Sequence, residues 1–430
     1  MDDPEDNFSF LESEPSLLDM SSSYYKKVSK EKAKTKFIYL SVFLGVVTIL
    51  EYFTRDYLKT FSNYLFHSND PSRCYKYNYV EFYSFSGKYF ILFLIYNYVN
   101  IFAALNLIFL DTFGLALNGI IRYFYLEPRP FWENEDSFPC FCATDYSGPS
   151  TTGTNIMIIF ASLYRSFTYK NKNSYQRNFL AFVCTFCVIG IYYIRLAQNV
   201  DYLHQILFGC ALGFGIHYWY YYIIKVNFYN RKQFRQIINQ PIIMTTLIIS
   251  VWLVINMIHF NTNFRTKPIY VLNIQKYCVI NTVFSFDKET FTKSILIFEF
   301  FGSYLGVLME YRITFGGKID LFAKYNIKSK HKEMFNHTSG GVSFVRFLLF
   351  YFVQVLIFKR IIYNKVSAIN YEQSTLFVLV FLLFIPLVIQ GIFFFYFMKR
   401  IVVWLGLTNE SLFKVQQQDS LPQSKIDDID

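Results

Sequence analysis

"PIIMTTLIISVWLVINMIHF" at Pro241–Phe260 contains no Asp, Glu, Lys or Arg, and His259 is its only side chain able to become positively charged. A second run, "TLFVLVFLLFIPLVIQGIFFFYFM" at Thr375–Met398, carries no charged residue at all. About 20 apolar residues cross the hydrocarbon core of a bilayer, so each run predicts a membrane-spanning helix. Two such runs exceed what a soluble core needs, and we predict an integral polytopic membrane protein.

The composition of the whole chain supports the same class. Of 430 residues, 53% are hydrophobic and only 17% are charged, whereas a soluble domain is about 25% charged. We predict an all-α transmembrane helical bundle of about nine or ten spans. The second and third predicted spans are poorly separated, with Asp111 between them. A total of nine spans is therefore the alternative to ten. The predicted spans are 37–53, 89–109, 111–126, 153–169, 178–197, 204–225, 241–260, 291–309, 343–362 and 375–398.

The lysine and arginine bias predicts the orientation, because basic loops stay in the cytosol. With a cytosolic N-terminus, the basic connections 165–177, 226–240 and 310–342 also fall in the cytosol. The fit is imperfect, because five basic residues fall on the other side: Lys59, Arg73, Lys76, Lys359 and Arg360. Membrane topology explains the formal net charge of +10, so the composition does not call for a nucleic-acid partner.

The seven cysteines do not form the framework of a small disulfide-rich protein. Cys74, Cys140, Cys142 and Cys278 fall on the predicted lumenal side, where a disulfide is chemically allowed. Cys140 and Cys142 could also be a metal-binding pair, but no matching His/Cys cluster follows them. We therefore predict no metal site and no cofactor.

Three polar segments abut predicted helix ends on the same non-cytosolic face. They are Arg122–Pro130, Asp145–Gly153 and Ile194–Gly209. Arg122 and Arg129 are seven residues apart, about two helical turns, and two arginine forks on one face suit a phosphate group. The alternative is that both arginines simply extend to the lipid headgroups.

The second and third segments also permit two interpretations each. In the second segment, small residues at Gly148–Thr152 precede a predicted helix. Backbone N–H groups at a helix N-terminus can bind an anion. The alternative is that Ser or Thr at this position is an ordinary helix cap. Arg195, Asp201 and His204 are ionisable residues at a membrane boundary, which are often functional. The alternative is a helix-end Arg195 that is paired with Asp201.

In order and spacing, the three segments resemble the type-2 phosphatidic acid phosphatase superfamily, which includes lipid phosphate phosphatases, sphingosine-phosphate phosphatases and glucose-6-phosphatase. Its first motif, Lys, six residues, Arg-Pro, is similar to "RYFYLEPRP" at Arg122–Pro130. Its second, Pro-Ser-Gly/Thr-His, is similar to "PSTT" at Pro149–Thr152. Its third, Ser-Arg, five residues, His, three residues, Asp, is similar to "IRLAQNVDYLHQ" at Ile194–Gln205. The "FW" after Pro130 and "HQILFG" at His204–Gly209 look like the glucose-6-phosphatase branch.

The resemblance covers roughly residues 90–225 and implies a six-helix phosphatase-like core. In the family, the third-motif histidine attacks phosphorus, the second-motif histidine protonates the leaving oxygen, and cationic and hydroxyl groups hold the phosphoryl oxygens. The resemblance implies that the phosphate-binding positions are Arg122, Arg129, Ser150, Thr151 and Arg195.

Both catalytic histidines are replaced. Asp201 stands at the nucleophile position and Thr152 at the acid position. Loss of an acid–base group commonly costs 10²–10⁴ in rate, so we predict an impaired enzyme that binds a phosphorylated lipid or sugar, or acts as a subunit of a membrane complex. The alternative is an active lipid-phosphate or glucose-6-phosphate phosphatase that uses Asp201, or His204 one turn further on, as nucleophile.

The resulting organisation has four parts. These are a polar cytosolic tail at 1–36, the phosphatase-like transmembrane core with its lumenal loops at 37–225, additional transmembrane helices at 226–398 and a second polar cytosolic tail at 399–430. The expected partners are membrane lipids, a phosphorylated lipid or sugar and other membrane proteins. The resemblance implies the endoplasmic reticulum or another endomembrane.

Overall fold

The computed structural model describes residues 15–66, 79–99, 101–134, 137–140, 142–143, 145–168, 173–224, 240–261, 267–278, 296–310, 312, 340–363 and 384–407. Within these ranges the chain is helical and contains no β-strand. Five helical stretches are long and apolar enough to cross a membrane: Ala33–Phe66, Ile101–Glu133, Ser174–Ala197, Gly340–Phe358 and Ile385–Trp404. The prediction of an all-α membrane protein is confirmed. The number of spans stays a prediction, because segments such as 364–383 lie outside the described residues.

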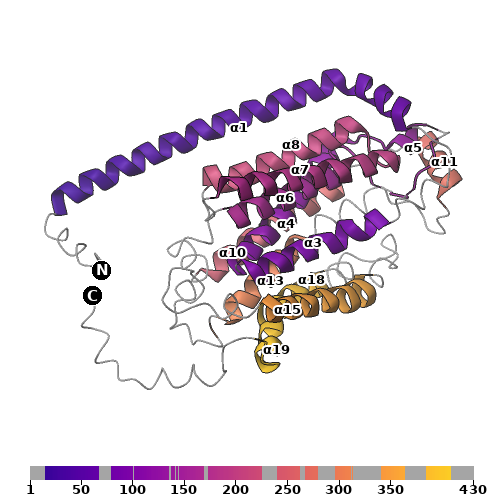
Figure 1. Cartoon of the computed structure of the whole chain (residues 1–430). Coiled ribbons are helices and arrows are strands. Elements are labelled where there is room, and N and C mark those ends of the chain that lie inside the picture. The colour runs from indigo at the N-terminus through magenta and orange to yellow at the C-terminus, as the bar shows by residue number, and fades with distance from the viewer. Residues whose placement is uncertain are drawn as a thin grey trace.

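Helix α1 (Pro15–Phe66) is much longer than the span predicted at 37–53, and it includes part of the polar N-terminal segment. It lies along the outside of the bundle beside α8 (Figure 1). Only 11% of its most apolar window is buried, and large side chains such as Phe43 and Val46 are exposed. Apolar side chains that are exposed on a membrane-spanning helix are positioned to face lipid.

The boundary between the second and third predicted spans is wrong. Helix α3 (Tyr79–Tyr98) ends before Asn100, and α4 (Ile101–Tyr125) runs without interruption through Asp111. Asp111 is fully buried and forms an ion pair with Lys88 of α3, with the Asp111 Oδ2 and Lys88 Nζ atoms 2.7 Å apart. Asp111 does not need to reach water, because its counter-charge Lys88 lies inside the protein. The helix can therefore continue through it.

Helices α6 (Thr151–Thr168) and α8 (Leu203–Tyr218) pack with their backbones close together, and α7 (Ser174–Ala197) connects them. A Cβ atom added to Gly153 of α6 would lie 2.8 Å from the carbonyl oxygen of Ile206 on α8. Small residues commonly permit such approach between membrane helices. The contact fixes the first turns of α6 and α8 beside each other, which places the second and third polar segments at one end of the bundle.

The second half of the chain adds further helices on the other side of α3 and α4 (Figure 1). They are α10 (Pro241–Asn261), α13 (Ile297–Met309), α15 (Gly340–Val353), α18 (Ile385–Ile392) and α19 (Met398–Trp404). Three π-helical stretches continue these or earlier helices: η1 (Trp219–Ile224), η3 (Gln354–Tyr363) and η5 (Phe393–Phe397).

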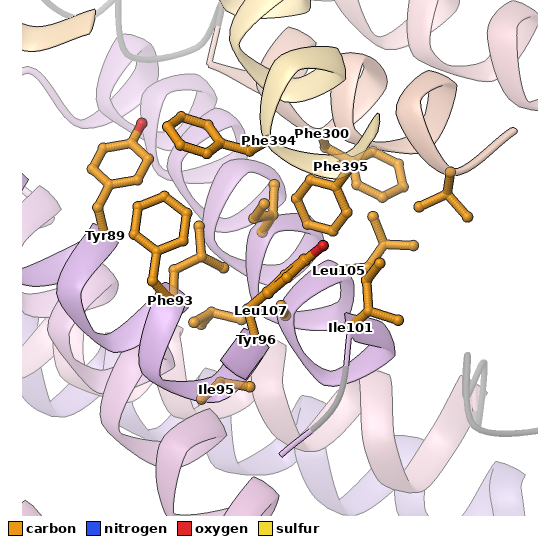
Figure 2. Packing of buried hydrophobic residues seen from close by; sticks show 14 of the residues in the cluster. Tyr89, Phe93, Ile95, Tyr96, Ile101, Leu105, Leu107, Phe300, Phe394 and Phe395 are labelled. Carbon is orange, nitrogen blue, oxygen red and sulfur yellow. The ribbon is translucent and has the colours of Figure 1, made fainter. Parts of the chain in front are cut away.

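Aromatic rings hold these later helices to α3. Figure 2 shows Phe93 against Phe394 and Tyr96 against Phe395, with ring centroids 4.8 Å and 5.5 Å apart. The four side chains are at most 3% exposed. Aromatic pairs at such separations contribute beyond the area that they bury, so the second half of the chain shares a core with the first.

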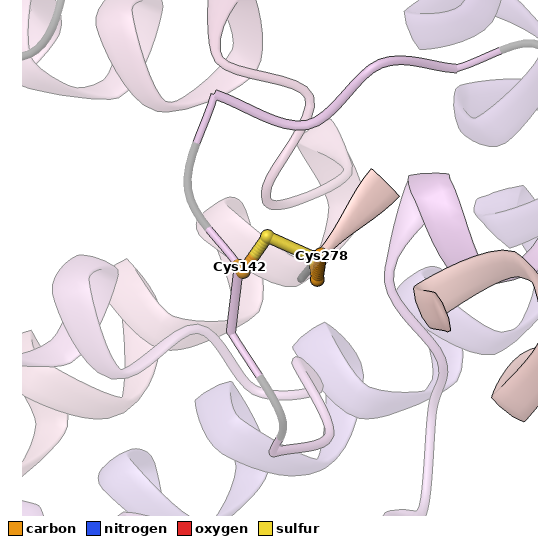
Figure 3. The surroundings of a disulfide bond; sticks show 2 residues. All are labelled: Cys142 and Cys278. Atoms are coloured by element: carbon orange, nitrogen blue, oxygen red, sulfur yellow. A yellow bond between two sulfur atoms is a disulfide. The ribbon is translucent and has the colours of Figure 1, made fainter. Parts of the chain in front are cut away.

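At the end of the bundle that carries the polar segments, short helix α5 (Pro130–Glu133) packs against α11 (Pro268–Tyr277). The Trp132 and Tyr270 ring centroids are 6.1 Å apart, and Asn273 Nδ2 donates to the Trp132 carbonyl at 2.8 Å. A disulfide between Cys142 and Cys278 joins the same two regions (Figure 3). Of the cysteines expected on the lumenal side, Cys74 lies outside the described residues.

Candidate functional site

Four helix ends meet where α5 and α11 lie (Figure 1). Helix α4 ends at Tyr125 and α7 at Ala197, whereas α6 begins at Thr151 and α8 at Leu203. The loops between these helices therefore bring the three polar segments to one end of the bundle. The N-termini of α6 and α8 also contribute positive dipole ends, which favour negative charge nearby.

Asp145 lies between the two arginines of the first segment. Its carboxylate oxygens accept hydrogen bonds from Nη1 of Arg122 and Nη2 of Arg129. Its backbone carbonyl accepts from Arg129 Nε at 2.7 Å, and Arg122 Nε donates to the carbonyl of Pro149 at 3.0 Å. Asp145 is fully buried, and both arginines are 2% exposed. A carboxylate of the protein itself thus occupies the space between two guanidinium groups.

Asp201 occupies the neighbouring position and joins all three segments. Its Oδ1 lies 3.0 Å from Arg129 Nη1, and its Oδ2 lies 3.0 Å from Arg195 Nη2. The hydroxyl of Ser147 donates to Oδ1, and that of Ser150 donates to Oδ2 at 3.0 Å. Both carboxylate oxygens of Asp201 are therefore engaged, and its side chain is 1% exposed.

These contacts keep Asp201 ionised. Burial by itself raises the pKa of a carboxyl group, but here the positive charges of Arg195 and Arg129 outweigh burial. Together with the Ser147 hydrogen bond, they hold the pKa of Asp201 well below its ordinary value. The carboxylate is thus the anionic partner of the arginines and is a poor proton acceptor.

The second segment is fixed from both sides. Asn118 of α4 donates from Nδ2 to the Pro149 carbonyl at 3.3 Å, and the Ser150 backbone N–H donates to the Gln205 carbonyl at 3.0 Å. Thr151 is buried, and its hydroxyl makes no hydrogen bond within the described part of the chain. Thr152 is half-buried on the first turn of α6.

His204 belongs to a different cluster. Its Nε2 lies 3.0 Å from Glu127 Oε1 and 3.9 Å from Glu51 Oε1 of α1. Lys59 Nζ lies 3.2 Å from the same Glu127 oxygen, and Arg55 Nε lies 3.1 Å from Glu51 Oε1. One ligand atom from each of Glu51, Glu127 and His204 could approach a metal ion, since these atoms lie within 4.8 Å of one another. Lys59 and Arg55 already provide positive charge to the two carboxylates, so a metal ion would compete with them.

Of the residues predicted from sequence, the structure brings Arg122, Arg129, Ser150, Arg195 and Asp201 into one cluster, in which Arg195 is partly exposed and the others are buried. It places His204 beside Glu127 and α1 instead.

Sequence reasoning missed the roles of Asp145 and Ser147, although both lie within the second segment, Asp145–Gly153. The available signal was charge, because buried arginines require anionic partners and Asp145 is the acidic residue of that segment.

Residues 102–229 match the family model of the PAP2 superfamily. No curated protein and no solved structure matches the chain. The matched residues include all four helix ends and every member of the arginine cluster. The segment that carries this cluster is therefore similar to the PAP2 superfamily.

Proposed function

We propose that this membrane protein binds the phosphate group of a phosphorylated lipid or sugar at its PAP2-like site and does not hydrolyse it. The observation that carries the proposal is the pairing of Arg122 and Arg129 with the two carboxylate oxygens of Asp145. Arginine forks bind carboxylate and phosphate in the same bidentate manner. A phosphate group could therefore replace Asp145 between the two arginines.

The net charge of the cluster supports anion binding. Three guanidinium groups, of Arg122, Arg129 and Arg195, face two carboxylates, of Asp145 and Asp201. Counted over these five side chains, one positive charge exceeds the negative charge. The Arg195 side chain, which is 16% exposed, is the most accessible of the three. An incoming phosphate would meet an arginine that is partly open to solvent before it displaced Asp145.

The contacts of Asp201 argue against catalysis. A carboxylate that attacks a phosphate dianion is repelled by it unless a metal ion or a similar charge offsets the repulsion. Both oxygens of Asp201 already interact with Arg129, Arg195 and two serine hydroxyls. The alternative nucleophile, His204, has its Nε2 beside Glu127. These contacts support binding without attack by either residue.

A binding and turnover assay on the full-length protein in lipid nanodiscs tests the proposal. We expect binding of inorganic phosphate and of orthovanadate, without phosphate release from phosphatidic acid or from a hexose 6-phosphate. Asp145→Asn should strengthen binding, because it removes the competing carboxylate, whereas Arg129→Ala should abolish it. Arg165→Ala, at the opposite end of α6, is the matched control and should change nothing. Competition by the two phosphorylated compounds distinguishes a lipid ligand from a sugar ligand.

Two results would overturn the proposal. One is phosphate binding that survives Arg129→Ala. The other is phosphate release that disappears in Asp201→Ala or His204→Ala, which would establish the active-phosphatase alternative. Restoring both histidines, in the double variant Thr152→His and Asp201→His, should create phosphate release in a protein that otherwise has none. Membrane protein partners, an endomembrane location and cytosolic termini remain predictions.

A further inference from the structure

A second group of charged side chains is buried deep among the helices, away from the arginine cluster. Lys88 of α3 lies between Asp111 of α4 and Glu299 of α13, with its Nζ 2.7 Å from Asp111 Oδ2 and 2.9 Å from Glu299 Oε2. The three side chains are 8%, 0% and 2% exposed. Asn155 of α6 contacts the other oxygen of Asp111 through its side-chain amide. Four helices thus contribute one side chain each.

The charges of this group do not balance. Two carboxylates face one ammonium group, and among the described residues these are the charged groups that face Asp111 and Lys88. Asp111 lies in the middle of α4, which is part of the apolar stretch Ile101–Glu133 that is long enough to cross a membrane. An uncompensated charge in such a place is costly, and ionisable residues at membrane depth usually mark a functional site. Electrical neutrality of this group therefore requires one further positive charge.

Asp111 is better suited than Glu299 to hold that charge as a proton. Glu299 lies in the first turn of α13, where the helix dipole stabilises a negative charge. Asp111 is in mid-helix and has no such help. Its neighbour Asn155 can accept a hydrogen bond as well as donate one, so the amide can pair with a protonated carboxyl group.

A buried polar stripe leads from this group to the arginine cluster. Asp111, Asn118 and Arg122 are spaced by seven and four residues on α4, which places them on one face of the helix. All three are at most 2% exposed. Asn118 bonds Thr154, and Thr154 is the chain neighbour of Asn155, which contacts Asp111. Polar side chains therefore continue along α4 from the helix interior to the site.

We propose that Lys88, Asp111 and Glu299 form an intramembrane proton-binding site, in which the Asp111–Glu299 pair holds one proton at neutral pH. The proton is taken from water and cancels the excess negative charge, which lets α13 pack against α3 and α4. Glu299 lies outside the PAP2-like segment, so the proton couples the later helices to the segment that carries the arginine cluster. This inference does not depend on phosphate binding.

Infrared difference spectroscopy of the full-length protein in nanodiscs tests the inference, because a protonated carboxyl group has a carbonyl stretch separate from carboxylate bands and shifts in D₂O. We expect this band in the wild type at neutral pH. Asp111→Asn should remove the band, because this variant lacks one carboxyl group of the pair and Lys88 then balances Glu299. Glu299→Gln should remove it as well, because Lys88 and Asp111 then balance as a simple ion pair.

Glu310→Gln is the matched control. Glu310 is a buried carboxylate that pairs with Lys399 and lies outside the Lys88 group, so its replacement should leave the band unchanged. The elution profile in detergent shows which variants remain folded, and the wild-type spectrum alone suffices if a variant does not fold. Absence of the band in the wild type, or its persistence in Asp111→Asn, would overturn the inference. A band that appears only after Na⁺ is removed would overturn it too, in favour of a bound metal cation.

Discussion

Arg129 and Asp201 form an ion pair across 72 residues of sequence, with Arg129 Nη1 and Asp201 Oδ1 3.0 Å apart. The pair connects Arg129, the residue before α5, with Asp201, which lies two residues before α8 begins. Arg129 also donates to the carbonyl of Val200 at 3.0 Å. The first and third polar segments are therefore joined by one arginine side chain.

Replacing Asp201 should destabilise the protein in a pH-dependent way. Removal of one partner from a buried ion pair costs about 3–5 kcal/mol, and we expect a loss of this order for Asp201→Ala at neutral pH. The pKa of Asp201 is lower in the folded protein than its ordinary value. Its contribution is therefore fully present above the ordinary carboxyl pKa and is lost as the pH falls through the lower, folded-state pKa.

Thermal unfolding in detergent, measured for wild type and Asp201→Ala across acidic and neutral pH, checks this prediction. The difference in unfolding temperature should be largest near neutral pH and should shrink toward strongly acidic pH. Asp56→Ala, a replacement of a carboxylate on α1 outside the cluster, is a control whose effect should be small. An equal loss at every pH would show that Asp201 stabilises the fold without its charge.

The arginines of the cluster should differ in their importance for folding. Arg129 is 2% exposed and donates to Asp145, Val200 and Asp201. The Arg195 side chain is 16% exposed and interacts with Asp201. Removing a buried, multiply bonded charge partner costs about 3–5 kcal/mol, whereas a charge-assisted hydrogen bond is worth about 1.5–3 kcal/mol.

We therefore expect Arg129→Ala to lower the unfolding temperature clearly more than Arg195→Ala does. Unfolding of both variants should be followed under identical detergent conditions. The lysine variants Arg129→Lys and Arg195→Lys keep the charge and remove the fork. Arg129→Lys should recover little stability, because the three donors of an ammonium group are on one nitrogen, whereas Arg129 donates four hydrogen bonds from three separate nitrogens. A larger loss for Arg195→Ala than for Arg129→Ala would contradict this ranking.

The membrane class and the meeting of the three polar segments could be predicted from sequence, for different reasons. Apolar runs such as Pro241–Phe260 indicate a lipid environment directly, because a run of about 20 apolar residues matches the thickness of the bilayer core. Arg122, Arg129 and Arg195 could be placed at one end of the bundle because an alternating topology puts the relevant helix ends on one face. Both inferences use only the order of residues along the chain.

The residues that neutralise buried charge could not be predicted in this way. Asp111 looked like a boundary between spans because its partners, Lys88 and Glu299, come from other helices. His204 looked close to the arginines because it follows Asp201 by three residues, but its ring lies beside Glu127 and Glu51. Which carboxylate meets which cation is decided by tertiary packing, and the sequence order does not contain it.

Loss of the Cys142–Cys278 disulfide should loosen the contact between α11 and the loop before Asp145. The bond closes a loop of 136 residues and attaches the end of α11 to the loop before Asp145. Removal of a native disulfide typically costs about 2–5 kcal/mol. We expect the double variant Cys142→Ser and Cys278→Ser to unfold at lower temperature and to be cleaved faster by protease within α11. The double variant Cys184→Ser and Cys187→Ser, which removes two free thiols of α7, is the control and should be cleaved at the wild-type rate.

The close packing of α6 against α8 leads to the last prediction, for which the chain provides its own control. A Cβ atom at Gly209 of α8 would meet the carbonyl oxygen of Ser150, which is backbone and cannot move away as a flexible side chain could. Gly209→Ala should therefore force the first turns of α6 and α8 apart and disturb Ser150, which donates to Asp201. Overpacking of this kind costs about 1–3 kcal/mol.

Gly190 of α7 has no atom within 4 Å of an added Cβ. Gly190→Ala should keep or raise stability, because alanine is favoured over glycine in a helix interior by about 1 kcal/mol. The two variants make the same chemical change on neighbouring membrane helices, so a comparison of their unfolding temperatures isolates the effect of the α6–α8 contact. If Gly209→Ala unfolds at the same temperature as Gly190→Ala, the two helices do not approach closely enough to fix Ser150 beside Asp201. Phosphate binding measured on Gly209→Ala would then stay at the wild-type level, whereas separation of the helices should weaken it.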